Sequence, residues 1–153
     1  MPSEKAKYLK NRPSPPYDYK DVKSEMKNFS SEKIEELLLS FSSRNTPLWR
    51  TLIIMTATSR FEKDRDISVL QAALLYALNL EDHISYDRAG AYRFIVYPVI
   101  EFFKENNRSK VVMALLEEIL PVLENASYCL QDEGSWYEAH EELSELYRES
   151  VKE

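Results

Sequence analysis

Residues 46–80 read TPLWRTLIIMTATSRFEKDRDISVLQAALLYALNL, the most apolar continuous run of the chain interrupted by its most densely charged segment. Thr46 followed by Pro47 is a typical helix N-cap and first helical position, and Ser68 with Gln71 three residues later is a capping box. The stretch therefore predicts two apolar helices joined by the charged residues 59–66 (SRFEKDRD). We expect the remaining helices to pack around this pair.

Glycine is scarce, with two in 153 residues. Few positions can then adopt the positive φ that hairpins and phosphate-cradling loops need. The length fits one domain, and an apolar fraction of 44% is enough for a core. Good helix N-caps precede amphipathic runs at four places: Ser30, Thr46, Ser68 and Ser135. We predict an all-α fold, a single bundle of six or seven helices over residues 29–153.

The N-terminal residues 1–28 have a different composition from the rest. They carry four prolines, three of them at Pro13, Pro15 and Pro16, among Lys, Ser and Tyr, and almost no aliphatic side chains to bury. This composition predicts a disordered tail. Its interleaved Lys and Tyr side chains could stack on single-stranded nucleic acid, although plain tails often share this composition.

Helical spacing of apolar residues predicts where the other helices begin and end. One runs from Ser30 to about residue 43, one from about residue 85 to residue 106, one from residue 111 to about residue 130, and the last begins at Ser135. Pro98 and Pro121 are expected to kink or split two of them, because proline cannot donate to the carbonyl four residues before it. The predicted core includes Trp49, Leu52, Leu74, Leu78 and Phe102.

Charge is unevenly distributed around a formal net charge of −6. Residues 1–30 hold seven Lys or Arg against four Asp or Glu, whereas residues 111–153 hold eleven acids against two bases. A uniformly basic nucleic-acid-binding face is therefore not expected. We also expect no membrane span and no signal peptide, since no apolar segment is long enough, and hence a cytoplasmic protein.

The sequence offers little for catalysis or metal binding. Cys129 lies among acidic and aromatic neighbours, which favour the thiol over a reactive thiolate. His140 has no partner at zinc-binding spacing, and His83 is expected to be a capping or surface residue. We expect no enzyme activity, no cofactor and no metal.

The charged residues 59–66 are the candidate binding segment. Arginine side chains bind phosphate, and an aromatic ring can stack on a nucleobase. The basic side chains and the one phenylalanine of this segment would therefore suit a nucleotide. The candidate nucleotide-binding residues are Arg50, Arg60, Phe61, Lys63 and Arg65. The acids of the segment could instead pair with these bases, and the segment would then be only a solvated turn.

Residues 46–80 resemble the iron–sulfur domain of the archaeal and eukaryotic primase large subunit. The resembling features are Thr46–Pro47–Leu48–Trp49, an apolar helix, a charged loop, Ile67–Ser68, and a helix with Ala72–Ala73–Leu74–Leu75 before Asn79–Leu80. Leu48 or Trp49 stands where the family has its first cluster cysteine, and Val69 and Ala72 replace its His and Arg. The resemblance therefore implies the domain without its cluster.

Such a cysteine-free relative resembles the small noncatalytic third subunit of crenarchaeal primases. The resemblance implies an accessory role in primer synthesis for DNA replication, with the catalytic and large primase subunits as protein partners. The protein would help to bind a nucleoside triphosphate, or the primer 5′ end on a single-stranded template. Two other classes stay open: a small helical scaffold subunit of a CRISPR effector complex, and a protein adaptor with no nucleotide binding.

Overall fold

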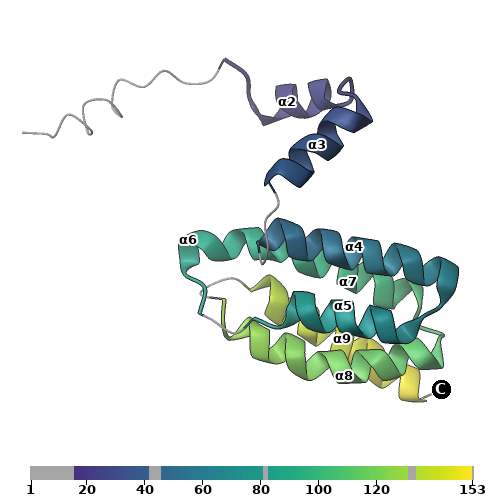
Figure 1. The fold of residues 1–153 in the computed structure, drawn as a ribbon. Helices are drawn as coiled ribbons and strands as arrows, with labels where there is room; N and C mark the ends of the chain where they lie inside the picture. The colour runs from purple at the N-terminus through teal and green to yellow at the C-terminus, as the bar shows by residue number, and fades with distance from the viewer. Residues whose placement is uncertain (1–15, 42–45, 81–82, 131–133, 153) are drawn as a thin grey trace, which may run out of the picture. The chain divides into compact units, whose positions relative to one another are not determined.

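The computed structural model describes residues 16–41, 46–80, 83–130 and 134–152, and the chain divides into two units, residues 1–40 and 41–153. The first unit contributes α2 (Tyr19–Met26) and α3 (Ser31–Phe41) (Figure 1). The second contains α4 (Pro47–Asp64), α5 (Ile67–Leu78), α6 (Tyr86–Ala89), the 3-10 turn η1 (Gly90–Tyr92), α7 (Arg93–Glu105), α8 (Lys110–Ser127) and α9 (Ser135–Lys152). The predicted all-α fold is confirmed.

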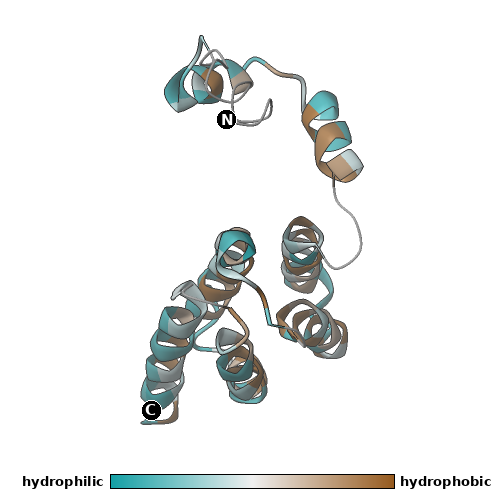
Figure 2. Cartoon of the chain, turned by 90° about the vertical axis from the view of Figure 1, so that its left-hand side faces the viewer, coloured by the Kyte–Doolittle hydropathy of each residue, from teal (hydrophilic) through white to brown (hydrophobic). Residues whose placement is uncertain are grey.

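The five longer helices of the second unit pack in a closed ring. α4 contacts α5, α5 contacts α8, α8 contacts α9, α9 contacts α7, and α7 returns to α4. Figure 2 looks along these helices. Each helix places at least one fully buried aliphatic side chain in the shared core: Ile54, Leu74, Val99, Leu116 and Leu143. Burial of this continuous apolar core is the main favourable contribution to folding.

The predicted core is partly correct. Leu74, Leu78 and Phe102 are buried, whereas Trp49 and Leu52 are half-buried. The buried stripe of α4 is instead Ile54, Ala57 and Phe61, at spacings of three and four residues.

The predicted loop over residues 59–66 is wrong, because α4 continues through Asp64. Phe61 extends the buried stripe of α4, and the residues around it are good helix formers, so packing and propensity both prolong the helix. Only Arg65 and Asp66 separate α4 from α5. Arg65 ends α4 in the left-handed conformation at φ 59°, and its N–H donates to the Phe61 carbonyl (2.9 Å).

Of the predicted kinks or splits at the prolines, the splits are wrong, because neither proline ends its helix. Pro98 lies inside α7 and Pro121 lies inside α8. Val96 and Val99 near Pro98, like Ile119 and Leu123 near Pro121, are buried in the core, and this packing holds each helix together despite one missing hydrogen bond. The break in the long predicted helix falls at η1 instead, before α7 begins.

The first unit revises the predicted tail. Residues 19–26 form α2, which Asp18 and Asp21 start with a reciprocal capping box, so a helix occupies part of the predicted tail. Residues 1–15 of that prediction lie outside the described residues. Ser30 accepts from the Lys33 N–H (3.2 Å), which confirms the predicted start of α3. Neither α2 nor α3 buries a residue, and the first unit ends at residue 40.

Candidate functional site

Arg50 does not belong to the candidate binding segment. Its guanidinium donates to the carbonyls of Tyr76 (2.9 Å) and Ala77 (3.2 Å) at the end of α5, and it lies 5.6 Å from the Tyr76 ring centroid. Both carbonyls belong to the last turn of α5, where an arginine side chain can serve as a C-terminal cap. Arg50 also lies ten residues, about 15 Å of helix, from Arg60. The structure therefore assigns it to packing of α4 against α5.

The turn between α4 and α5 uses its acids to hold the backbone. The Asp66 carboxylate accepts from the Ser68 hydroxyl (2.7 Å) and from the N–H groups of Ser68 (3.2 Å) and Val69 (3.4 Å), so Asp66 and not Ser68 is the N-cap of α5. The Ser68 hydroxyl, followed by these N–H groups, lowers the pKa of Asp66. The Asp64 carboxylate accepts from the Asp66 N–H (2.9 Å). Two of the three acids in this segment thus satisfy backbone groups.

Phe61 serves the core and not a ligand. Its side chain is 5% exposed, and its ring meets the Phe102 ring edge-on at a centroid distance of 5.7 Å. The Arg65 guanidinium lies 5.3 Å from the Phe61 ring centroid. No open face remains for a base, but the ring holds Arg65 at the surface. The predicted stacking role for Phe61 is therefore withdrawn.

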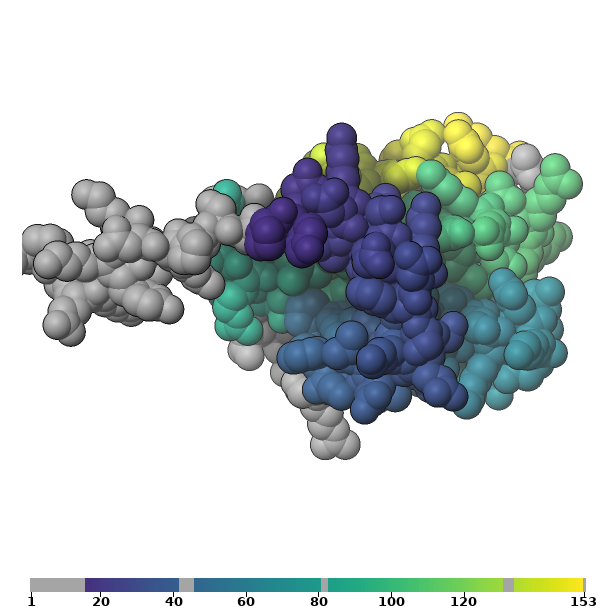
Figure 3. Space-filling view, turned by 90° about the horizontal axis from the view of Figure 1, so that it is seen from above, coloured from purple at the N-terminus to yellow at the C-terminus, as the bar shows by residue number. Residues whose placement is uncertain are grey.

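Two further cations lie at the same end of the bundle, and the sequence reasoning missed them. Arg108 and Lys110 flank Ser109, the N-cap of α8. Lys110 borders one surface hollow together with Ile67 and Gln71 of α5, so the start of α8 lies beside the α4–α5 turn. Figures 1 and 3 show these segments at one end of the second unit. The signal in the sequence was a pair of cations around a helix N-cap, where the helix dipole favours anions.

We call this surface the basic end and define it by five exposed side chains: Arg60, Lys63, Arg65, Arg108 and Lys110. In the described part of the chain, none of these five forms an ion pair with a carboxylate, whereas Lys104 pairs with Glu142 and Arg148 with Glu145. The alternative in which the acids of residues 59–66 pair with these bases is thus not what the described side chains form. Glu62 and Glu105 are also exposed nearby, so anion selection here must depend on direct contacts more than on long-range attraction.

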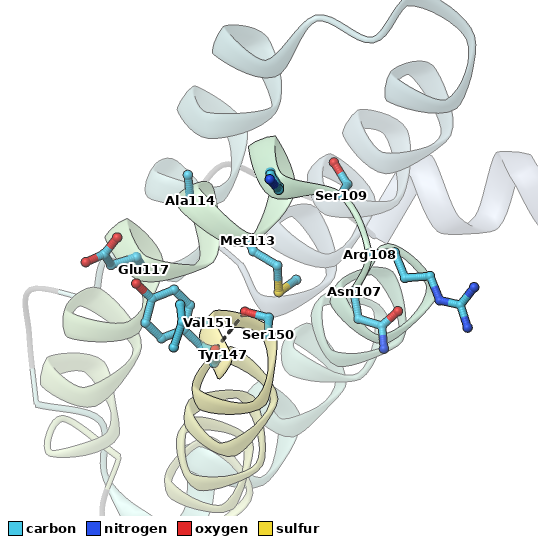
Figure 4. Close-up of a pocket in the computed structure, with 10 residues that line it drawn as sticks. Asn107, Arg108, Ser109, Met113, Ala114, Glu117, Tyr147, Ser150 and Val151 are labelled. Carbon is cyan, nitrogen blue, oxygen red and sulfur yellow. Dashed lines mark hydrogen bonds between the residues drawn. The ribbon is translucent and has the colours of Figure 1, made fainter. Parts of the chain in front are cut away.

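A groove between α8 and α9 opens beside the basic end (Figure 4), and we call it the α8–α9 groove. It has a volume of about 680 Å³ and begins at Arg108 and Lys110. Met113 is buried at its base, and the half-buried Tyr147 lies next to Glu117 at its far side. The hydrogen bond with Glu117, together with burial, raises the pKa of Tyr147. The groove thus has a cationic end, an apolar middle and a carboxylate at the other end.

Among the residues that the structure describes, the remaining titratable side chains form no further site. His140 lies 3.8 Å from a Glu124 oxygen and 4.0 Å from a Glu141 oxygen, and the Cys129 thiol lies 3.4 Å from the Leu80 carbonyl. Within the described ranges no group of three or more His, Cys, Asp or Glu side chains could hold a metal ion. In the same ranges no helix combines the length and the apolar character that crossing a membrane requires.

Comparison with known proteins adds no family to these observations. No protein-family model, curated protein or solved structure matches the chain.

Proposed function

We propose that the protein is a noncatalytic accessory subunit of a primase, and that its basic end binds the triphosphate of the initiating nucleotide or the 5′ end of the primer. The observation that carries this proposal is a set of five exposed cations at one end of the bundle, three at the end of α4 and two at the start of α8, which lies beside α5. Their neighbours Asp64 and Asp66 are engaged with backbone N–H groups. The cations are therefore available to an external anion, and arginine is well suited to phosphate oxygens.

The resemblance of residues 46–80 to the primase large-subunit domain supports the choice of assembly. These residues form α4 and α5, and the end of α4 with the residue that follows it carries three of the five cations, Arg60, Lys63 and Arg65. Phosphate binding of this kind needs neither a metal nor a nucleophile from this chain. The catalytic and large subunits would supply the chemistry, with template and primer passing close to the basic end.

The surface of α3 supports the presence of a protein partner. Leu37, Leu38 and Phe41 share one face of α3 and are 52%, 40% and 77% exposed, and α3 buries no residue. Exposed apolar side chains on one short helix are typical of a segment that docks on another protein. The same face favours a second candidate function, a helical adaptor or scaffold subunit without nucleotide affinity.

Calorimetric titration separates the two functions. The ligands are ATP, GTP and inorganic triphosphate at low ionic strength, and the variant is Arg60→Gln with Lys63→Gln. The matched control is Arg88→Gln with Arg93→Gln, which removes the same charge from the α6–α7 region (Figure 1). We expect the first variant to weaken triphosphate binding by about tenfold or more, because each charge-assisted hydrogen bond contributes substantially. Added salt should weaken wild-type binding, since these contacts are exposed.

Two results would favour the adaptor instead. One is the absence of triphosphate binding to the wild-type protein at millimolar ligand, and the other is equal affinity in the basic-end variant and the control. The assembly is tested separately by affinity purification from the native host. Recovery of the primase catalytic and large subunits is expected, and their absence would contradict the primase assignment.

A further inference from the structure

We infer that the α8–α9 groove binds the base of a guanine nucleotide whose phosphates contact the basic end. This inference rests on the proposed function for its phosphate contacts. It adds a site for the base and a preference among bases, which the cations alone cannot provide.

The two ends of the groove suit different groups of one ligand, an anion at one end and hydrogen-bond donors at the other. Lys110 and Arg108 at one end are donors only and carry positive charge, so they require an anion. Glu117 at the other end offers carboxyl oxygens that accept hydrogen bonds, so it suits N–H or O–H donors of a ligand. Lys110 and Glu117 are seven residues apart on α8, which is two turns on one face and about 10 Å. A purine nucleotide has a comparable distance between the pairing edge of its base and its phosphates.

The middle of the groove suits a flat ring. Met113 is 5% exposed at the base, and Val151 and the Tyr147 ring border the space above it (Figure 4). A thioether packs well against an aromatic face. The Ser150 hydroxyl donates to the Tyr147 carbonyl (2.7 Å), so it stays with its own helix.

Glu117 selects guanine among the bases. The pairing edge of guanine offers two adjacent N–H donors, at N1 and at the 2-amino group, which match the two oxygens of a carboxylate. Adenine places its unprotonated N1 acceptor at the same position, which a carboxylate repels. The Tyr147 hydroxyl, hydrogen-bonded with Glu117, positions the carboxylate on the groove side of α8. Carboxylate recognition of this edge is thus the basis of the expected preference.

The test is calorimetric titration with GTP, ATP and inorganic triphosphate on the wild type and on Glu117→Gln. The matched control is Glu118→Gln, the next residue of α8, which borders a different hollow and hydrogen-bonds with Gln71. We expect GTP to bind the wild type at least about tenfold more tightly than ATP or inorganic triphosphate. Glu117→Gln should remove this preference and leave the affinity for inorganic triphosphate unchanged, and Glu118→Gln should keep the preference. Both positions are exposed, so the melting temperature should not change.

The outcomes separate this inference from the proposed function. Equal affinities for GTP, ATP and inorganic triphosphate would overturn the base site while the phosphate site stands. A GTP preference that survives in Glu117→Gln would overturn it as well. Absence of any triphosphate binding would overturn the proposed function itself, and with it the phosphate contacts on which the base site depends.

Discussion

Replacement of Leu74 by alanine tests the core at the point where α5 enters the ring of helices. Leu74 has no exposed surface and belongs to a core that all five longer helices share. The change removes three buried carbon atoms and leaves a cavity that the surrounding side chains fill only in part. Large-to-small substitutions of this kind cost about 2–5 kcal/mol. Because neighbouring helices enclose the site, we expect a loss of about 3 kcal/mol or more in the free energy of unfolding.

The neighbouring Leu75 provides a matched control on the same helix. Its side chain is 37% exposed, so Leu75→Ala should cost roughly 1 kcal/mol or less. Urea unfolding followed by circular dichroism at the helical band gives both values from the shift in midpoint at constant slope. A loss for Leu74→Ala below about 0.5 kcal/mol, or equal losses for the two variants, would show that α5 does not present this face to the core.

Three further predictions concern a buried hydrogen bond, a residue with positive φ and a helix cap. Trp136 is fully buried and its Nε1 donates to the Tyr92 carbonyl (2.8 Å), so Trp136→Phe should lower the free energy of unfolding by about 2 kcal/mol or more; a change below about 0.5 kcal/mol in urea unfolding would contradict this. Arg65 has positive φ, so Arg65→Gly should be more stable than Arg65→Ala by about 1 kcal/mol, and equal melting temperatures would be evidence against a strained position. The lowered pKa of Asp66 means that its ionised form stabilises the fold above the ordinary carboxyl range and that this stabilisation is lost as pH falls through the folded-state pKa. Residue 66 does not titrate in Asp66→Asn, so wild type should lose more stability than the variant between about pH 6 and about pH 3. If the melting temperatures of both proteins fall equally over this range, the stabilising role of the Asp66 carboxylate is refuted.

Local signals predicted the start of several helices correctly. Ser30 and Thr46 each accept the N–H of the residue three positions later, because capping depends on a few adjacent residues that the sequence shows directly. The spacing of apolar residues likewise identified the buried face of α5. These features need no knowledge of distant contacts.

The end of α4 was mispredicted because it depends on a distant contact. A run with three bases and three acids is compatible with a loop or with a solvated helix. Burial of Phe61 against Phe102, which lies 41 positions later, decides for the helix. The predicted splits at Pro98 and Pro121 failed for the same reason, since packing against neighbouring helices outweighs one lost hydrogen bond.

The candidate site was only partly predictable for a related reason. Arg60, Lys63 and Arg65 are exposed as expected, but Arg50 caps the end of a helix whose carbonyls lie 26 and 27 positions later. Arg108 and Lys110 join the site only because α5 and α8 pack side by side. Side-by-side packing of helices is a property of the fold and not of any local pattern.

The most direct test of phosphate binding at the basic end is a titration of isotopically labelled protein with inorganic triphosphate, followed by amide chemical shifts. We expect the largest shifts in residues 60–66 and 107–111, where the two cationic turns meet. Amides near Arg50 and in residues 86–93 should remain unchanged. Shifts that are absent at millimolar triphosphate, or that are largest outside the two turns, would contradict the account.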